Sequence, residues 1–254
     1  MFLSEPTDSP YDLHFSILGI PVRVHPMFWL ISVFFAARGG ENTKADELLI
    51  GVAVCFVSIV VHEMGHALVM RKYGEVPRVV LYGMGGLAIS EGTYSGRRRS
   101  SSEDIIISFA GPAAGFIFAA IIIAVVNGFV GKVFFAAPTL SNPTFWRIIG
   151  INNERTFDLV SLLLDFNILW GMINLLPVYP LDGGQIARQW MVSKDPYNGT
   201  RNSLTLSVAV GIVMAVIGWV LWDQIFVAVL FGSLAFSSYQ MLQQFGGGGR
   251  RGRW

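Results

Sequence analysis

Charged side chains are scarce in this chain. Asp, Glu, Lys and Arg together account for 14% of its 254 residues, against about 25% in ordinary soluble globular proteins. The mean hydropathy is correspondingly high, at +0.54. This composition excludes a soluble domain and is typical of a membrane protein whose apolar spans are joined by short loops.

The chain also lacks a charge bias and a pair of cysteines. Its formal net charge is +1, so it has no global attraction for nucleic acid, and we expect no nucleic-acid partner. Cys55 is the only cysteine, which excludes an internal disulfide and leaves the redox compartment undetermined. Residues 1–20 show neither a basic n-region nor a small-residue cleavage site. We therefore expect the first span to act as its own targeting signal.

Long apolar stretches dominate what is present. Six of them cover approximately residues 26–37, 47–70, 105–131, 159–180, 203–222 and 225–245. The third contains no charged residue and is long enough to cross a hydrocarbon core of about 30 Å. Little more than Asp223 and Gln224 separates the last two, which predicts a tight helical hairpin. We expect an all-α polytopic membrane protein with six transmembrane helices.

The basic residues favour one side of such an arrangement. With six spans, one side carries Arg23, Arg71, Lys72, Arg97, Arg98, Arg99, Arg188, Lys194, Arg201, Arg250, Arg251 and Arg253. The opposite loops carry the smaller set Arg38, Lys44, Lys132, Arg147 and Arg155. Because positively charged loops remain in the cytoplasm, this asymmetry predicts that both termini are cytoplasmic.

The most informative motif is His-Glu-Met-Gly-His at residues 62–66, which follows the uncharged apolar run at 48–61. Residues four apart on a helix are separated by about 40° around its axis, so His62 and His66 can reach one metal ion. Glu63 then faces a water on that metal rather than the metal itself. Ionisable groups inside a span cost about 2.5–3.5 kcal/mol each and indicate a functional site. The motif predicts a zinc hydrolase whose active site lies within the bilayer.

A catalytic zinc usually has three protein ligands and a water, and this motif supplies two of them. Asp182 is the best candidate for the third. It follows a span that ends in Pro177 and Pro180, which break the helix and turn the chain inward. Gly183 and Gly184 come directly after it, and we expect them to let another helix approach closely.

Two further stretches predict β-hairpins. Residues 15–24 have β-branched side chains around a Gly-Ile-Pro turn, and residues 76–92 alternate around several glycines. Non-helical backbone at membrane depth is tolerated only against protein or a water-filled cavity. We therefore expect these short membrane-associated β-hairpins to lie beside the metal site.

The motif at 62–66 and the Asn-x-x-Pro-x-x-x-x-Asp-Gly stretch at 174–183 resemble the site-2 protease family of intramembrane zinc metalloproteases. Three shorter stretches are similar to that family as well: GIPVRVHP at 19–26, YGMGG at 82–86 and AGP at 110–112. The resemblance covers approximately residues 14–188, whereas the last two spans match only as hydrophobic helices.

The resemblance implies a three-helix catalytic core made of the second, third and fourth spans. It implies one Zn²⁺ per chain, held by His62, His66 and Asp182, with Glu63 as the general base. Asn174 falls at the family's asparagine position, which implies a hydrogen bond from Asn174 to the substrate carbonyl or oxyanion. Hydrogen bonding between helices is an equally weighted interpretation of Asn174.

The chain shows neither the PDZ insertion nor the CBS pair of some relatives, so the resemblance is to the compact prokaryotic type. This implies a prokaryotic cytoplasmic membrane, and the loop charges predict that the active site lies toward the cytoplasm. We expect one transmembrane protease domain over residues 1–245, with a catalytic core at about 47–188 and a helical hairpin at 203–245. A disordered basic tail at 246–254 would lie near anionic lipid. The sequence does not determine the oligomeric state.

The expected function is regulated intramembrane proteolysis, the hydrolysis of a peptide bond in or near a transmembrane segment of another membrane protein. A divalent-metal transporter is one alternative. Transport would need a series of polar residues through the spans, and residues 50–61 contain only Ser58. A non-catalytic metal-binding membrane protein is disfavoured because every expected catalytic position is filled. A prenyl-protein peptidase would need a downstream glutamate ligand, and no glutamate follows Glu154.

Overall fold

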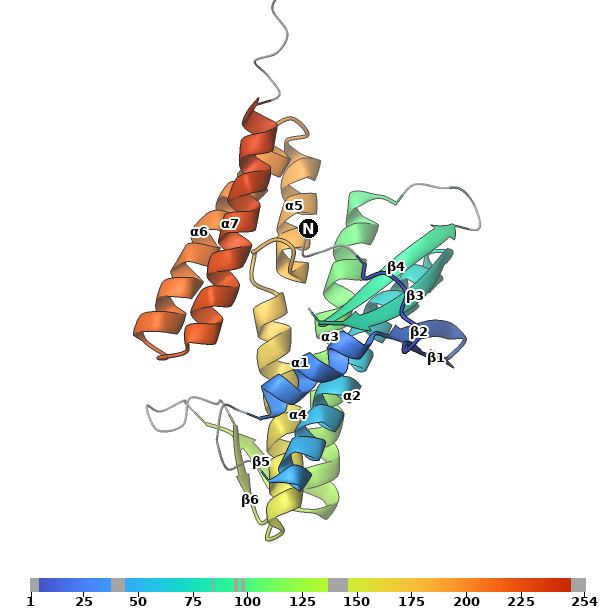
Figure 1. Cartoon of the computed structure of the whole chain (residues 1–254), viewed down its shortest axis with the longest axis vertical. Coiled ribbons are helices and arrows are strands. Elements are labelled where there is room, and N and C mark those ends of the chain that lie inside the picture. Colours follow the sequence, from blue (N-terminus) through green and yellow to red (C-terminus); the bar gives the residue numbers. More distant parts are fainter. Residues whose placement is uncertain are drawn as a thin grey trace, which may run out of the picture. The chain divides into compact units, whose positions relative to one another are not determined.

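The computed structural model describes residues 5–37, 44–83, 85–93, 96, 99–136 and 146–247 (Figure 1). These fall into two compact units. The first comprises Met1–Arg97 and Ala110–Gly171, and the second comprises Arg98–Phe109 and Met172–Trp254. The basic tail predicted for residues 246–254 lies outside the described residues from position 248 onward.

Helices make up most of the described chain. They are α1 (Pro26–Ala36), α2 (Ala45–Lys72), α3 (Ser101–Phe129), α4 (Glu154–Asn174), α5 (Asp182–Lys194), α6 (Gly199–Val220) and α7 (Ile225–Gly247). Five of them, α2, α3, α4, α6 and α7, are long and apolar enough to cross a membrane. The mostly helical membrane fold agrees with the sequence.

The prediction of six spans is not confirmed in the described part of the chain. The predicted first span forms α1, which has 11 residues. At a rise of about 1.5 Å per residue this helix is about 16 Å long, against a hydrocarbon core of about 30 Å. Residues 38–43, which follow it, lie outside the described residues.

The two predicted hairpins belong to one four-stranded sheet. Its strands are β1 (Leu13–Ile17), β2 (Ile20–Val24), β3 (Glu75–Tyr82) and β4 (Gly85–Thr93), in the order β1-β2-β3-β4. β1 pairs antiparallel with β2, and β3 pairs antiparallel with β4. The parallel pairing of β2 with β3, which joins the hairpins, was not predicted from the sequence.

One face of this sheet packs against α1 and α2. Alternate residues of a strand share a face, so Ile20, Val22 and Val24 of β2 enter one buried cluster together with Val79 and Leu81 of β3. The α2 residues in this cluster are Cys55, Ile59, Val60, Met64 and Ala67. The sheet is therefore anchored on the part of α2 that carries the histidine motif.

A third hairpin packs against α3 and α4 in the first unit. β5 (Lys132–Phe135) and β6 (Trp146–Ile149) pair antiparallel. Val133 and Trp146 enter a buried cluster with Ala119 and Val126 of α3 and Leu164 of α4. These two strands were not among the predicted elements.

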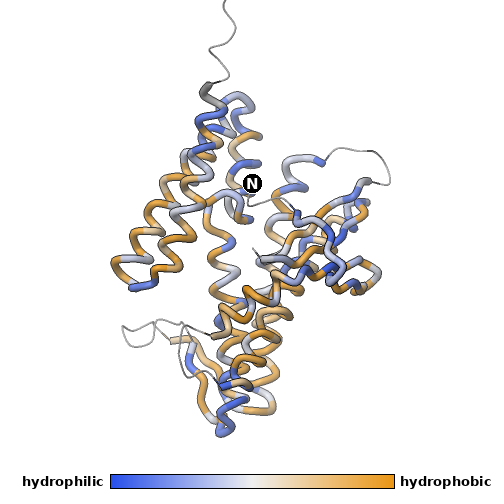
Figure 2. The backbone as a smooth tube through the Cα atoms, viewed as in Figure 1, coloured by the Kyte–Doolittle hydropathy of each residue, from blue (hydrophilic) through white to orange (hydrophobic). Residues whose placement is uncertain are grey.

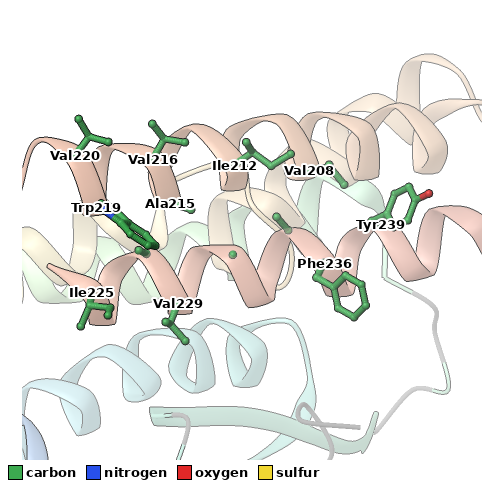
Figure 3. A pocket seen from close by; sticks show the side chains of 13 residues that line it. Val208, Ile212, Ala215, Val216, Trp219, Val220, Ile225, Val229, Phe236 and Tyr239 are labelled. Atoms are coloured by element: carbon green, nitrogen blue, oxygen red, sulfur yellow. The ribbon is translucent and has the colours of Figure 1, made fainter. Parts of the chain in front are cut away.

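In the second unit, α6 and α7 form an antiparallel pair that turns near Asp223, where φ is 50°. Figure 2 shows hydrophobic residues along most of both helices and hydrophilic ones at the turn. Gly211 lies against Ala235, because a Cβ at Gly211 would meet the Ala235 Cβ at 2.9 Å. A groove of about 800 Å³ runs between the two helices; its lining includes Ile212, Trp219 and Phe236 (Figure 3).

Candidate metal centre

Helix α2 carries the motif, and the three side chains with metal or acid–base chemistry are buried. His62, Glu63 and His66 are 6%, 7% and 7% exposed, respectively. The Nε2 atoms of the two histidines lie 3.2 Å apart. Two Zn–N bonds of about 2.0–2.1 Å at a tetrahedral angle would separate two nitrogens by about 3.3 Å. The separation of the two nitrogens therefore matches that of two imidazole ligands on one zinc ion.

Helix α3 approaches the histidines through a glycine. A Cβ placed on Gly111 would meet the Nε2 atoms of His66 at 2.2 Å and of His62 at 2.7 Å. In the other direction, a Cβ on Gly65 would meet the carbonyl oxygen of Ala110 at 2.4 Å. Small residues that bring two backbones together are typical of packed transmembrane helices. The sequence marked residues 110–112 as similar to the family, and it did not predict the contact of Gly111 with both imidazoles.

The β4 strand lies against the predicted general base. A Cβ on Gly86 would meet the Cγ of Glu63 at 2.3 Å and its Oε1 at 2.6 Å. The carboxylate therefore lies directly against the β4 backbone. Within the first unit, the hairpin predicted to flank the motif does flank it.

A buried hydrogen bond joins α2 to α4 one helical turn before the motif. The Nδ2 of Asn167 donates to the Oγ of Ser58 at 2.9 Å and to the carbonyl oxygen of Leu163 at 2.8 Å. Ser58 and Asn167 are 2% and 3% exposed. Sequence reasoning missed this pair, although an asparagine inside an apolar span is a signal that a polar partner is needed.

Asp182 and Asn174 belong to the second unit, at the two ends of an irregular loop. Asn174 is the last residue of α4, and Asp182 is the first residue of α5. The predicted fourth span, 159–180, therefore ends as a helix at Asn174 and continues as residues 175–181 without helical structure. Asn174 is 8% exposed and Asp182 is 9% exposed.

The glycines after Asp182 have a different role from the one predicted. A Cβ on Gly183 would meet the carbonyl oxygen of Leu175 at 2.1 Å, and a Cβ on Gly184 would meet the backbone nitrogen of Tyr179 at 2.5 Å. The segment that approaches them is thus the chain's own preceding loop rather than another helix. The loop folds back onto the first turn of α5.

The donor types present match those of a catalytic zinc site. Imidazole nitrogens and a carboxylate oxygen are ligands that zinc takes in proteins. A carboxylate beside such a pair, as Glu63 is here, can accept a proton from a metal-bound water. The arrangement around α2 can therefore support metal-assisted hydrolysis.

Comparison with known proteins also indicates a zinc peptidase. Peptidase family M50 matches residues 50–217. A zinc metalloprotease of Methanocaldococcus jannaschii is 28% identical over 206 residues, which cover 80% of this chain and 52% of the relative. Stage IV sporulation protein FB of Bacillus subtilis is 25% identical over 231 residues, which cover 89% of this chain and 68% of that protein.

This chain spans about half the length of the first of these relatives. A solved structure, the site-2 protease from Methanocaldococcus jannaschii, superposes with a TM-score of 0.58 and 24% identity. The superposition covers 91% of this chain and 95% of that structure, which establishes a shared fold.

Proposed function

Because the chain belongs to peptidase family M50, we propose that it is an intramembrane zinc endopeptidase. Its reaction is the hydrolysis of a peptide bond in or near a transmembrane segment of another membrane protein. The observation that carries this proposal is the buried pair of Nε2 atoms 3.2 Å apart in His62 and His66, with Glu63 between them in sequence.

Asp182 completes the ligand set in this proposal, so that each chain holds one Zn²⁺. In a catalytic zinc site with three protein ligands, a carboxylate can be the third ligand beside two imidazoles. Asp182 is buried at the start of α5, as expected of a carboxylate with a buried partner. The resemblance of residues 174–183 to the family motif supports the same assignment.

The chemistry divides among the chain's own residues. A zinc ion in this site supplies Lewis-acid polarisation of the scissile carbonyl and acidifies the water that it binds. The Glu63 carboxylate takes the proton of the attacking water and passes it to the nitrogen of the leaving amine. The side-chain amide of Asn174 donates a hydrogen bond to the carbonyl oxygen as negative charge develops on it.

The substrate is held as an extended strand in this proposal. A transmembrane helix hides its carbonyl groups in hydrogen bonds, so it must unwind before hydrolysis. β4 is the last strand in the sheet order, and its Gly86 lies against Glu63. A peptide that adds to the outer edge of β4, which pairs with no other described strand, would pair its backbone with this strand beside the general base.

The six-span arrangement predicted from the sequence would place both termini and the active site on the cytoplasmic side. The resemblance to the compact type of the family implies a prokaryotic cytoplasmic membrane. The lipid bilayer and a transmembrane protein substrate are the partners of this protein.

The test is cleavage of a fluorescent single-span peptide in proteoliposomes that contain wild type or Glu63→Gln. We expect the wild type to produce fragments cut within or beside the span, and Glu63→Gln to bind zinc without cutting. Cleavage by Glu63→Gln at the wild-type rate would show that Glu63 is not the general base. Zinc uptake into the vesicles without cleavage would support the divalent-metal transporter instead.

A further inference from the structure

The loop that precedes Asp182 is hydrogen-bonded to both C-terminal helices. The backbone N–H of Tyr179 donates to the Oγ of Ser207 on α6 at 3.0 Å. The Oγ of Ser238 on α7 donates to the carbonyl oxygen of the same Tyr179 at 3.3 Å. Two side chains from separate helices thus engage both backbone polar groups of one loop residue.

These two serines are among the most buried polar residues of the described chain. Ser207 is 1% exposed and Ser238 is 0% exposed. The hydroxyl of Ser207 donates to the carbonyl oxygen of Ser203 at 2.9 Å, so its oxygen is oriented to accept from Tyr179. Irregular backbone that is shielded from water requires partners of this kind, because an unpaired buried polar group is costly. The serines therefore provide what the loop needs to keep its non-helical path.

Apolar contacts attach the same loop to the same helices. Val178, next to Tyr179, is fully buried and clusters with Phe231 and Leu234 of α7. Tyr179 in turn lies against the first turn of α5, because a Cβ on Gly184 would meet its backbone nitrogen at 2.5 Å. A continuous path of contacts thus leads from α6 and α7 through Tyr179 to the turn that begins with Asp182.

We propose that Ser207 and Ser238 are positioning residues for Asp182, so that the α6–α7 pair sets the geometry of the third zinc ligand. This inference rests on the proposed role of Asp182. It gives the C-terminal helices a defined part in zinc binding. Residues that orient a ligand commonly alter metal affinity by about 10–100-fold when they are removed.

The experiment measures zinc affinity of the full chain in detergent by competition with a chromophoric chelator. The variants are Ser207→Ala, Ser238→Ala and the double substitution. The matched control is Ser203→Ala, because Ser203 is 3% exposed and its hydroxyl donates to the Thr200 carbonyl oxygen of its own helix at 2.8 Å. We expect at least a tenfold loss of affinity in the double variant and a change of less than about twofold in the control.

A second readout separates positioning from a general loss of stability. The Co²⁺-loaded protein reports coordination through its visible absorption spectrum, which should change in the double variant. Ser207→Thr, which keeps the hydroxyl, should restore both the spectrum and the zinc affinity. In an Asp182→Ala background the serine substitutions should have no further effect, because they act only through Asp182.

The outcomes distinguish the two proposals. A double variant that binds zinc as tightly as wild type, with an unchanged Co²⁺ spectrum, would overturn the positioning role while leaving the proposed function intact. An equal loss of affinity in the Asp182→Ala background would overturn it as well. Wild type that binds no zinc would instead contradict the proposed function. If the double variant does not fold, Ser238→Ala alone, whose hydrogen bond is the longer one, decides by the same criteria.

Discussion

His62, Glu63 and His66 lie within one long helix, α2, whereas Asp182 lies where an irregular loop meets the short helix α5. The positions of the first three follow from helical geometry, and two glycines on neighbouring elements fit against their side chains. The position of Asp182 depends on hydrogen bonds that α6 and α7 provide to its loop. One region of the molecule is thus sensitive to added volume, and the other is sensitive to lost hydrogen bonds.

The largest effect is expected from Gly111→Ala. Its new methyl group would overlap His66 at a distance of 2.2 Å from Nε2, so the imidazoles must move and the zinc affinity should fall by at least about 100-fold. Zinc bound per purified chain measures this loss. Gly128→Ala is the control, since Gly128 lies on the same helix and a Cβ there would meet nothing within 4 Å. Full zinc occupancy in Gly111→Ala would show that the histidines tolerate added volume.

Gly86→Ala should separate catalysis from metal binding. The added methyl group would displace Glu63, whose Cγ would lie 2.3 Å away, while both histidines stay in place. Loss of general-base catalysis costs about 10²–10⁴-fold in rate, and we expect a decrease in that range with zinc retained. The comparison is with Gly83→Ala, where the nearest atom is 3.6 Å from the new Cβ. Equal cleavage rates in the two variants would contradict the role of β4 in holding the base.

Ser58→Ala should affect stability more than function. It removes the hydroxyl that accepts from Asn167, while the second bond of Asn167, to Leu163, remains. Such interhelical bonds contribute about 0.6 kcal/mol on average in membrane proteins and at most about 1.7 kcal/mol. Unfolding in mixed micelles should show a loss in this range with zinc binding unchanged. A large loss of zinc would mean that this bond positions the motif.

The smallest effect is expected in the N-terminal segment, far in sequence from the site. Arg78 hydrogen-bonds the carboxylate of Glu5, which holds the pKa of Glu5 below its ordinary value of 4.5. A lowered pKa in the folded state stabilises the fold above pH 4.5, and this contribution is lost as the pH falls through the folded-state pKa.

Glu5→Gln should therefore lower the melting temperature slightly at pH 7, and its difference from wild type should shrink in acid. The effect is small because the Glu5 side chain is 30% exposed, where screening weakens ion pairs. Thermal unfolding of both proteins between pH 7 and pH 3 measures it. A difference that grew as the pH fell would contradict this sign.

The proximity of the His62 and His66 imidazoles could be predicted from the sequence, because one local rule, the four-residue spacing on a helix, determines it. The sequence could not predict that Gly86 and Gly111 touch the motif, because those contacts depend on how distant elements pack. The end of α4 was misplaced for a local reason: Pro177 has no N–H to continue the helix, and the helix stops at Asn174. The apolar residues after it were included in the predicted span because hydropathy does not register this stop.

The second unit was least accessible from sequence. Ser207 and Ser238 lie within apolar spans, where a serine carries no signal of its partner. Only the folded chain shows both hydroxyl groups on the backbone of Tyr179. The role of Gly183 was likewise misread, because sequence alone does not say which segment approaches a glycine.

The most direct test of the central claim, that two separate segments form one zinc site, is the zinc content of purified protein. Wild type should contain about one zinc per chain, and both His62→Ala and Asp182→Ala should lose most of it. Full zinc retention in Asp182→Ala, with loss in His62→Ala, would contradict the account, because the third ligand would then lie elsewhere.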